Sequence, residues 1–304
     1  MDHTTRKTGP AVLARPFNSV GIFGKLGSAQ VAPVVRELQD YLREQHLAVH
    51  IETGTAELAA IPDAHTGTFE DVALRIDLGI VVGGDGTLLG VARHLAPAGV
   101  PLIGINLGRL GFLTDIQTSR MRETLRELLN GHFQREQRRL LHAEVIRDGS
   151  CVQAAIAFND VVINKGDLAR LIEFESYVNG EFVNTVRADG MVVATPTGST
   201  AYAFSAGGPI LEPTLPAIAL VPICPHMPSN RAIVVGSDRS IEIVMLHTNN
   251  QTAHVTFDGQ LNYALRDGDR IRIRTADHDI TLLHPINRSH YGMLRTKLRW
   301  GEKF

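Results

Sequence analysis

The chain has 304 residues, the length of about two domains of ordinary size. Hydrophobic residues make up 44% of it and charged residues 20%, so we expect a substantial core and no extensive disorder. The formal net charge of -2 argues against a general electrostatic attraction to nucleic acid or to an anionic membrane. The two cysteines, Cys151 and Cys224, exclude a disulfide scaffold, and their spacing fits no zinc motif, so we expect buried or incidental thiols.

The N-terminal residues do not resemble a targeting segment. Residues 1–10 are polar, and no long apolar stretch follows them, unlike a secretory signal. No apolar run approaches the ~20 residues that a membrane-spanning helix needs. We therefore expect a cytoplasmic protein with a disordered leader over residues 1–15.

The first half of the chain alternates strand patterns with helix patterns. Short apolar runs predict strands at residues 19–23, 47–51, 78–82 and 101–105. Apolar residues spaced by three and four predict helices at residues 30–44, 87–95 and 119–130. The last helix has Ser119 as its expected N-cap and Gly131 as its stop. This alternation predicts a doubly wound α/β domain with a parallel sheet over residues 16–138.

The pattern changes near residue 138, after which strand-like runs follow one another with little helical periodicity. The runs lie at residues 141–146, 155–163, 171–178, 181–186, 191–194, 240–246, 254–257, 270–274 and 279–283. Asn179-Gly180, between two runs, is typical of a type I′ hairpin turn because both turn positions need a positive φ. We therefore expect a mostly antiparallel β domain over residues 139–288. The tail, residues 289–304, is expected to pack on the first domain.

The strongest chemical signal is Gly83-Gly84-Asp85-Gly86-Thr87, between an apolar strand and a helix. Ligands usually bind at the carboxyl end of a parallel strand, where glycines let backbone N–H groups approach phosphate and the helix adds its positive end. An aspartate there repels phosphate, so it fits better as a base for a hydroxyl nucleophile or as a magnesium ligand. The plain alternative is a tight turn with a helix-capping aspartate.

Three further segments carry polar or aromatic groups suited to a ligand. Residues 106–113 (NLGRLGFL) follow the fourth strand, and Phe112 there either stacks on a base or belongs to the core. Asn159-Asp160 suits ribose hydroxyls, although such a pair is also typical of a bulge or turn. Residues 195–202 (TPTGSTAY) carry five hydroxyl side chains, with a solvated turn as the alternative.

Together these segments resemble the bacterial NAD kinases. Residues 83–87 match the GGDGT motif of that family, residues 106–112 its NxGxLGF segment, and residues 195–202 its TPTGSTAY signature. Residues 220–226 (LVPICPH) and 257–260 (FDGQ) are similar in kind. GGDGT alone also occurs in phosphofructokinases and in diacylglycerol and sphingosine kinases, so TPTGSTAY is the more specific signature. The resemblance covers the chain from about Ser19 to the C-terminus.

The resemblance implies transfer of the γ-phosphate of ATP to the 2′-hydroxyl of the adenosine ribose of NAD, with Asp85 as general base. The glycines and threonine of GGDGT would shape the phosphate loop. Asn159 and Asp160 match an Asn-Glu pair that holds ribose hydroxyls, here with an acid one methylene shorter. The further NAD-binding residues that it implies are Gly86, Phe112, Arg170, Arg187, Asp189, Thr197, Thr200, Ala201, Tyr202, Ala203, Phe204, Ser205 and Gln260. Asp189 could come from a neighbouring subunit.

Phosphoryl transfer depends mainly on alignment and charge neutralisation. Mg²⁺ is expected to arrive with ATP, and no dedicated protein metal cage is expected. The resemblance also implies an α/β domain followed by a β domain, with the site between them, and a homodimer or homotetramer with no nucleic-acid or membrane partner. Two other functions stay open: a lipid or sugar kinase that shares the GGDGT loop, and an NAD(P)-binding sensor without turnover. Polyphosphate could replace ATP as the donor.

Overall fold

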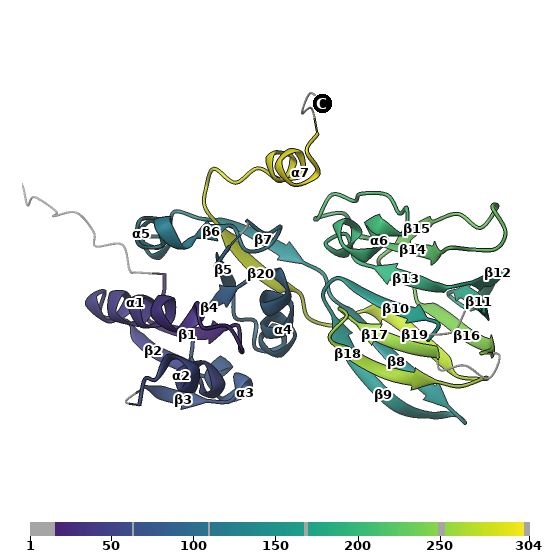
Figure 1. Ribbon diagram of the computed structural model, residues 1–304, viewed down its shortest axis with the longest axis horizontal. Helices are drawn as coiled ribbons and strands as arrows, with labels where there is room; N and C mark the ends of the chain where they lie inside the picture. The colour runs from purple at the N-terminus through teal and green to yellow at the C-terminus, as the bar shows by residue number, and fades with distance from the viewer. Residues whose placement is uncertain (1–15, 63, 109, 167–169, 249–252, 301–304) are drawn as a thin grey trace, which may run out of the picture.

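A computed structural model describes residues 16–62, 64–108, 110–166, 170–248 and 253–300. It has an α/β lobe and a β-sandwich lobe side by side (Figure 1). The predicted fold class is therefore confirmed. The leader expected over residues 1–15 lies outside the described residues. Among the helices of the described ranges, none combines the length and apolar character needed to cross a membrane.

The first lobe is built on an 8-stranded sheet in the order β3-β2-β1-β4-β5-β20-β7, with β6 paired to β5. Its strands are β1 (Ser19–Gly24), β2 (Ala48–Glu52), β3 (His65–Gly67), β4 (Leu78–Gly83), β5 (Leu102–Asn106), β6 (Ile116–Gln117), β7 (Gln134–Arg138) and β20 (Ile280–His284). All neighbours pair in parallel except β20 and β7. Four of the strands, β1, β2, β4 and β5, confirm the four predicted in this half.

Helices cover both faces of this sheet, which explains why its central strands are apolar throughout. One face carries α1 (Val31–Glu44), α2 (Thr53–Ala59) and α5 (Met121–Leu129), and the other carries α3 (Phe69–Ala73) and α4 (Asp85–Leu95). The predicted first helix is confirmed, and α4 begins two residues earlier than predicted, directly after the glycine pair of GGDGT.

The N-cap predicted for the third helix is wrong. A 3₁₀ turn, η2 (Thr118–Arg120), precedes α5, so the N-cap position falls on Arg120 and has no side-chain hydrogen bond. Ser119 lies inside that turn. Gly131 follows the end of α5 with φ 91°, as expected of a glycine stop.

The second lobe is a sandwich of two antiparallel 6-stranded sheets, β15-β14-β13-β10-β17-β18 and β12-β11-β16-β19-β8-β9. Its strands are β8 (Leu141–Arg147), β9 (Ser150–Ala157), β10 (Asp160–Asn164), β11 (Ile172–Val178), β12 (Glu181–Ala188), β13 (Gly190–Ala194), β14 (Ala217–Ile223), β15 (Ile233–Gly236), β16 (Ile241–His247), β17 (Ala253–Phe257), β18 (Leu261–Leu265) and β19 (Arg270–Thr275). Inward-facing residues of both sheets form one apolar core. The predicted hairpin turn joins β11 to β12, with φ 51° at Asn179 and 78° at Gly180.

Two expectations about strands in this half are wrong. The run at residues 155–163 is not one strand, because β9 ends at Ala157 and β10 begins at Asp160. The run at residues 279–283, placed by sequence in the second domain, forms β20 of the first sheet instead. The apolar pattern of β20 does not reveal which of the sheets this strand joins. The chain thus leaves the first lobe after β7 and returns to it at β20.

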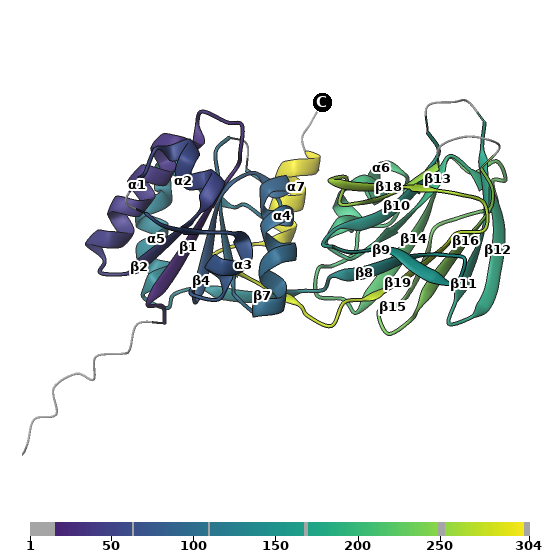
Figure 2. The same ribbon diagram turned by 90° about the horizontal axis from the view of Figure 1, so that it is seen from below.

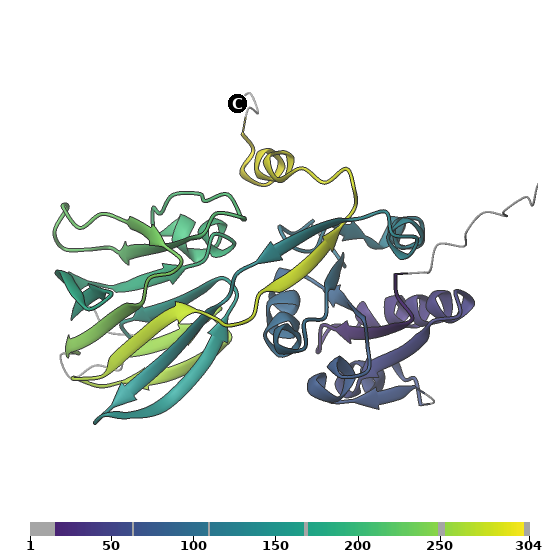
Figure 3. The same ribbon diagram turned by 180° about the vertical axis from the view of Figure 1, so that it is seen from behind.

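The segment after β20 is extended and ends in helix α7 (His290–Leu298), which stands at the upper edge of Figure 1 and is seen from behind in Figure 3. From below, α7 lies at the side of the first lobe that faces the sandwich (Figure 2). Of the two alternatives for the cysteines, buried or incidental thiols, burial is wrong, because Cys151 and Cys224 are both exposed and free.

Candidate active site

The GGDGT segment lies where β4 ends and α4 begins, at the carboxyl end of a central parallel strand. Gly84 is the N-cap of α4, and no side chain caps it. The carboxylate of Asp85 instead points to the segment after β5. It accepts hydrogen bonds from the backbone N–H groups of Phe112 (2.7 Å), Leu113 (3.1 Å) and Thr114 (3.0 Å), and from the Thr114 hydroxyl (2.9 Å). The helix-capping interpretation of Asp85 is therefore wrong.

The segment after β5 folds tightly around Asp85. Asn106 accepts a hydrogen bond from Gly108 N–H and donates one to the Thr114 hydroxyl, both at 2.7 Å. A Cβ on Gly111 would lie 2.0 Å from Oδ1 of Asp85, so only glycine fits there. Phe112 is half-buried and belongs to none of the apolar clusters found among the described residues, which disfavours the core interpretation.

A cavity of about 360 Å³ opens beside Asp85, and we call it the donor cavity. The ends of β4 and β5 line it with Gly83, Gly84 and Asn106, while Lys25 and Lys297 contribute positive charge. Glycine backbone at a helix N-terminus, combined with two ammonium groups, is suited to bind an anion with several phosphates. The donor cavity therefore has the chemistry that the GGDGT loop predicts.

A second cavity, of about 450 Å³, lies in the sandwich lobe, and we call it the ribose cavity. Asn159, Asp160 and Tyr202 are among its lining residues, as is Asp258. Burial, together with the nearby charge of Asp258, raises the pKa of Asp160 to about 7. The side-chain oxygens of Asn159 and Asp160 are suited to accept hydrogen bonds from the hydroxyls of a sugar.

Asp258 organises the break between β9 and β10. Its fully buried carboxylate accepts hydrogen bonds from the N–H groups of Phe158 (2.9 Å), Asn159 (2.7 Å) and Asp160 (3.2 Å). Burial raises the pKa of Asp258, and these donors together with Arg93 act in the opposite direction. Asn159-Asp160 thus lies at a sharp break stabilised by an acid 98 residues further along the chain.

Side chains from both lobes meet along α4, from Gly86 at its start to Arg93 in its last turn. Arg93 pairs with Asp258 at 3.2 Å and donates to Oε1 of Gln260 at 2.6 Å. Nε2 of Gln260 donates to the backbone oxygen of Gly86 at 2.6 Å. The amide of Gln260, an NAD contact by resemblance, therefore joins the two lobes in this structure. Arg93 was missed from sequence, because an arginine on an amphipathic helix carries no distinguishing signal.

The TPTGSTAY segment follows β13 and is not a solvated turn. Thr195 and Ser199 are buried, and their hydroxyls bond to backbone oxygens of Phe158 and Pro196 at 2.7 and 2.6 Å. A Cβ on Gly198 would lie 2.1 Å from the backbone oxygen of Asn159, so this segment packs directly on the Asn-Asp break. The other NAD contacts that the resemblance implies between residues 197 and 205 differ in exposure. Thr197 and Ala203 are buried, Thr200 and Ala201 are intermediate, and Tyr202, Phe204 and Ser205 are exposed.

Three predicted NAD contacts lie elsewhere. In the β10–β13 pair Asp160 faces Ala194 at one end and Asn164 faces Gly190 at the other, so Arg187 and Asp189 lie at the end away from Asp160. There Asp189 pairs with Lys165 at 2.6 Å, and Arg187 with Glu173 at 3.9 Å. Arg170 is exposed just before β11. Within one chain these three residues do not come together with Asp85.

A buried ionic network lies next to the site, and sequence analysis missed it. Arg138 donates to the Thr197 hydroxyl at 2.9 Å and pairs with Glu136 at 2.9 Å. Arg288 pairs with Glu136 at 2.6 Å and donates to the backbone oxygen of Phe112 at 2.7 Å. His284 and Asp115 complete the network. Its members come from β7, β20 and two loops, so no local sequence pattern could have revealed it.

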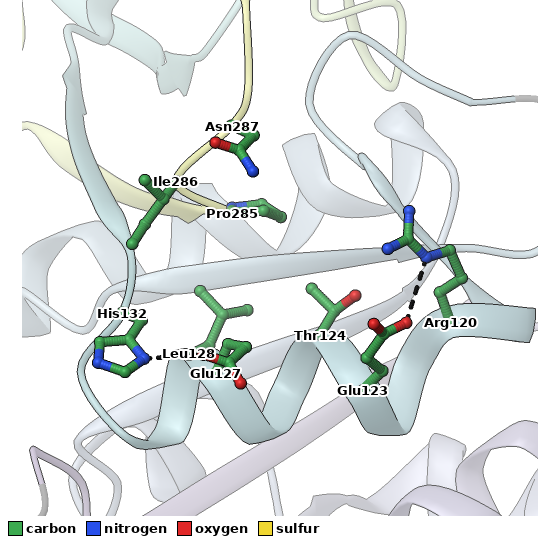
Figure 4. Close-up of a pocket in the computed structure, with 9 residues that line it drawn as sticks. All are labelled: Arg120, Glu123, Thr124, Glu127, Leu128, His132, Pro285, Ile286 and Asn287. Atoms are coloured by element: carbon green, nitrogen blue, oxygen red, sulfur yellow. Dashed lines mark hydrogen bonds and ion pairs between the residues drawn. The ribbon is translucent and has the colours of Figure 1, made fainter.

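Another hollow, of about 340 Å³, lies between α5 and the segment after β20 (Figure 4). Its rim carries the exposed pairs Arg120–Glu123 (3.4 Å) and Glu127–His132 (2.8 Å). None of the residues predicted for the site lines it. In the part of the chain that the structure describes, no three His, Cys, Asp or Glu side chains gather in an arrangement that could hold a metal ion.

The fold and the site define a two-lobed, nucleotide-binding phosphotransferase. The model of the ATP-NAD kinase N-terminal domain matches residues 20–133, and that of the ATP-NAD kinase C-terminal domain matches residues 158–284. The chain belongs to the ATP-NAD kinase family.

Similar proteins agree with this family. An NAD kinase of Thiobacillus denitrificans is 49% identical over 95% of this chain and 99% of its own length. An NAD kinase of Pseudomonas entomophila is 45% identical over 94% of this chain and 97% of its own length. The crystal structure of yeast NADH kinase with NADH superposes with a TM-score of 0.87 at 25% identity, covering 95% of this chain and 89% of that one. An Archaeoglobus fulgidus NAD kinase with ATP gives 0.73 at 26% identity, covering 92% and 98%.

Proposed function

We propose that the chain transfers the γ-phosphate of ATP to the 2′-hydroxyl of the adenosine ribose of NAD and releases NADP. The observation that carries the proposal is the position of Asp85, whose carboxylate lines the donor cavity at the start of α4. The Arg93–Asp258 pair and the Gln260 contact join this helix to the segment that lines the ribose cavity. The cavity proposed for the phosphate donor and the cavity proposed for the sugar acceptor are thus connected through one helix.

Asp85 acts on the attacking hydroxyl as general base. Four hydrogen-bond donors hold its two oxygens, so the orientation of the carboxylate is fixed before substrate arrives. Its main contribution is therefore alignment of the hydroxyl toward the γ-phosphate, which is what phosphoryl transfer chiefly requires. The glycine backbone of residues 83–86 and Thr87 shape the loop around the donor phosphates.

The acceptor lies against the sandwich lobe. Asn159 and Asp160 bind ribose hydroxyls, and Phe112 packs against the adenine. Thr197, Thr200, Ala201, Tyr202, Ala203, Phe204 and Ser205 surround the rest of NAD. Gln260 also contacts NAD. It does so either while it keeps its hydrogen bond to the backbone oxygen of Gly86 or after that bond has broken.

Asp189 lies at the end of β10 and β13 away from Asp160, Arg187 is at the end of β12, and Arg170 precedes β11, which supports a role at the site of a neighbouring subunit. We therefore propose a homodimer or homotetramer in the cytoplasm. Mg²⁺ would be held largely by the phosphate oxygens of ATP, next to the Asp85 carboxylate of the donor cavity. When bound, the ion neutralises charge on the transferring phosphate.

The test is to incubate the purified protein with NAD, ATP and Mg²⁺ and to detect NADP with a coupled NADP-specific dehydrogenase. Asp85→Asn should lower turnover by roughly 10²–10⁴-fold. Asp238→Asn, which removes an exposed acid before β16, is the matched control and should leave turnover unchanged.

Parallel reactions separate the alternatives. Diacylglycerol, sphingoid bases and fructose 6-phosphate replace NAD in one series, and polyphosphate replaces ATP in another. Faster phosphorylation of a lipid or sugar than of NAD would contradict the proposal. Tight NAD binding without any ATP-dependent product would instead identify a sensor.

A further inference from the structure

Helix α7 brings a cation from the end of the chain into the donor cavity. Met293 and Leu294 on this helix are buried. Lys297 follows them by four and three residues, so it lies on the same face of the helix and points toward the body of the protein. It is half-buried and lines the donor cavity. Arg295 lies on another face and is exposed.

The position of α7 is tied to the segment that holds Asp85. The Ser289 hydroxyl accepts the Gly292 N–H at 3.1 Å and caps the helix. Just before it, Arg288 donates to the backbone oxygen of Phe112, the residue whose N–H donates to Asp85. Nζ of Lys297 lies 5.9 Å from the centroid of the Phe112 ring, within the range of a cation–π contact. Phe112 therefore contacts both the Asp85 carboxylate and the C-terminal segment.

The charges in the donor cavity call for an anionic ligand. Lys297 and Lys25 enter from opposite ends of the chain, and within the described residues neither forms an ion pair with a carboxylate. Asp85, the acid of this cavity, is already engaged by four donors. A lysine ammonium is a compact point charge with three donors, suited to phosphate oxygens whose angles change during reaction.

We propose that Lys297 binds the phosphate chain of the donor, so that α7 forms one wall of the donor site. The inference rests on the proposed function only in assigning this cavity to the phosphoryl donor. The ligand is a linear chain of phosphates, which either a nucleoside triphosphate or a polyphosphate can supply. Lys297 is then a binding residue for the phosphate donor.

The test measures binding by titration calorimetry on the full-length protein without turnover. The probes are ATP with Mg²⁺, tripolyphosphate with Mg²⁺, and NAD, each added alone. The variants are Lys297→Gln, Lys297→Arg, and Arg295→Gln as a control that removes the same charge from the same helix. Circular dichroism melting of each variant checks that the fold is intact.

Lys297→Gln should weaken ATP binding about 10- to 100-fold, the effect of losing one charge-assisted hydrogen bond. NAD binding should stay within about twofold, Lys297→Arg should recover most of the affinity, and Arg295→Gln should bind as the wild type does. Equal weakening of tripolyphosphate identifies the phosphate chain as the bound group, whereas weakening of tripolyphosphate alone assigns the site to polyphosphate.

The inference is overturned if Lys297→Gln binds both phosphate probes like the wild type, if it loses NAD instead, or if Arg295→Gln loses as much. These results are independent of the proposed reaction. Wild-type protein that binds ATP but makes no NADP would contradict the proposed function, while a selective loss in Lys297→Gln would still support the inference.

Discussion

The guanidinium of Arg93 in α4 lies 3.2 Å from the buried carboxylate of Asp258, across the boundary between the two lobes. The same carboxylate accepts the backbone N–H groups of the Asn159-Asp160 break. Helix α4 begins at Asp85, so one ion pair connects the helix of the proposed base to the residues proposed to hold ribose. The relative position of the phosphate donor and the ribose acceptor thus depends on an ion pair that contacts neither substrate.

Replacing Arg93 should destabilise the protein strongly. Arg93→Met leaves Asp258 buried without its charged partner, which costs about 3–5 kcal/mol. Arg122→Met breaks an exposed pair with Glu37 (3.1 Å) and should cost less than about 1 kcal/mol. Urea denaturation at pH 7 compares the two free energies of unfolding. Similar losses for both variants would show that the Arg93–Asp258 pair adds nothing beyond a surface contact.

A methyl group at Gly111 should displace the Asp85 carboxylate. The added Cβ would lie 2.0 Å from Oδ1 of Asp85 and 2.5 Å from the Thr114 hydroxyl, so one of them must move. We expect Gly111→Ala to lower kcat about 10²-fold or more by misplacing the carboxylate, and to lower the melting temperature as well, because the displaced groups lose hydrogen bonds. A double-mutant cycle with Asp85→Asn measures the coupling. Full additivity of the two losses would mean that Gly111 does not act through Asp85.

Asp160 should make the protein less stable as pH rises toward 8. Its pKa is raised to about 7 by burial and by Asp258, so between about pH 4 and 7 the folded state holds a proton that the unfolded state has lost. Stability from this group is complete below its unfolded pKa and disappears as pH rises through 7. At ~1.4 kcal/mol per pKa unit, the total is a few kcal/mol.

Asp160→Asn removes this dependence, so the variant should be more stable than the wild type at pH 8 and lose that advantage near pH 4. Chemical denaturation across this range gives the difference. Asp238→Asn, at an exposed site, should track the wild type throughout. A constant difference between Asp160→Asn and the wild type would contradict a raised pKa.

Glu136 should have the opposite effect. Burial alone would raise its pKa, but His284, Arg138 and Arg288 hold the pKa well below its usual value. Its contribution to stability is therefore present above the unfolded pKa of about 4.5 and lost as pH falls. Glu136→Gln should be markedly less stable than wild type at pH 7, with a gap that narrows on acidification below 4.5. Glu123→Gln, at an exposed pair, is the control, and a gap independent of pH would contradict the charged network.

Local patterns predicted the parts of the fold that local forces determine. The apolar run of β4 is buried on both faces, and the hairpin at Asn179-Gly180 needs two positive φ angles, so each can be recognised within a few residues. The position of Asp85 at a strand end followed from the same logic. That the chain belongs to the ATP-NAD kinase family followed from motif resemblance rather than from periodicity.

Long-range pairings could not be read from the sequence. Nothing near Asp258 indicates that it accepts N–H groups of Asn159, and nothing near Gln260 indicates a bond to Gly86. The apolar run of β20 can pack in either lobe, so the sheet that it joins depends on competition among distant partners. The same holds for Lys297, which is an ordinary helical lysine until the fold sets it beside Asp85.

The position of β20 between β5 and β7 sets an order for folding on the ribosome. The sandwich is complete once β19 has emerged at Thr275, whereas the first sheet still lacks an internal strand at that point. The α/β lobe, although made first, can close only after residue 284 leaves the exit tunnel. The sandwich lobe, although synthesised later, is therefore the first that can finish folding. A chain that ended before β20 would leave β5 and β7 of the nucleotide-binding lobe without the strand that lies between them.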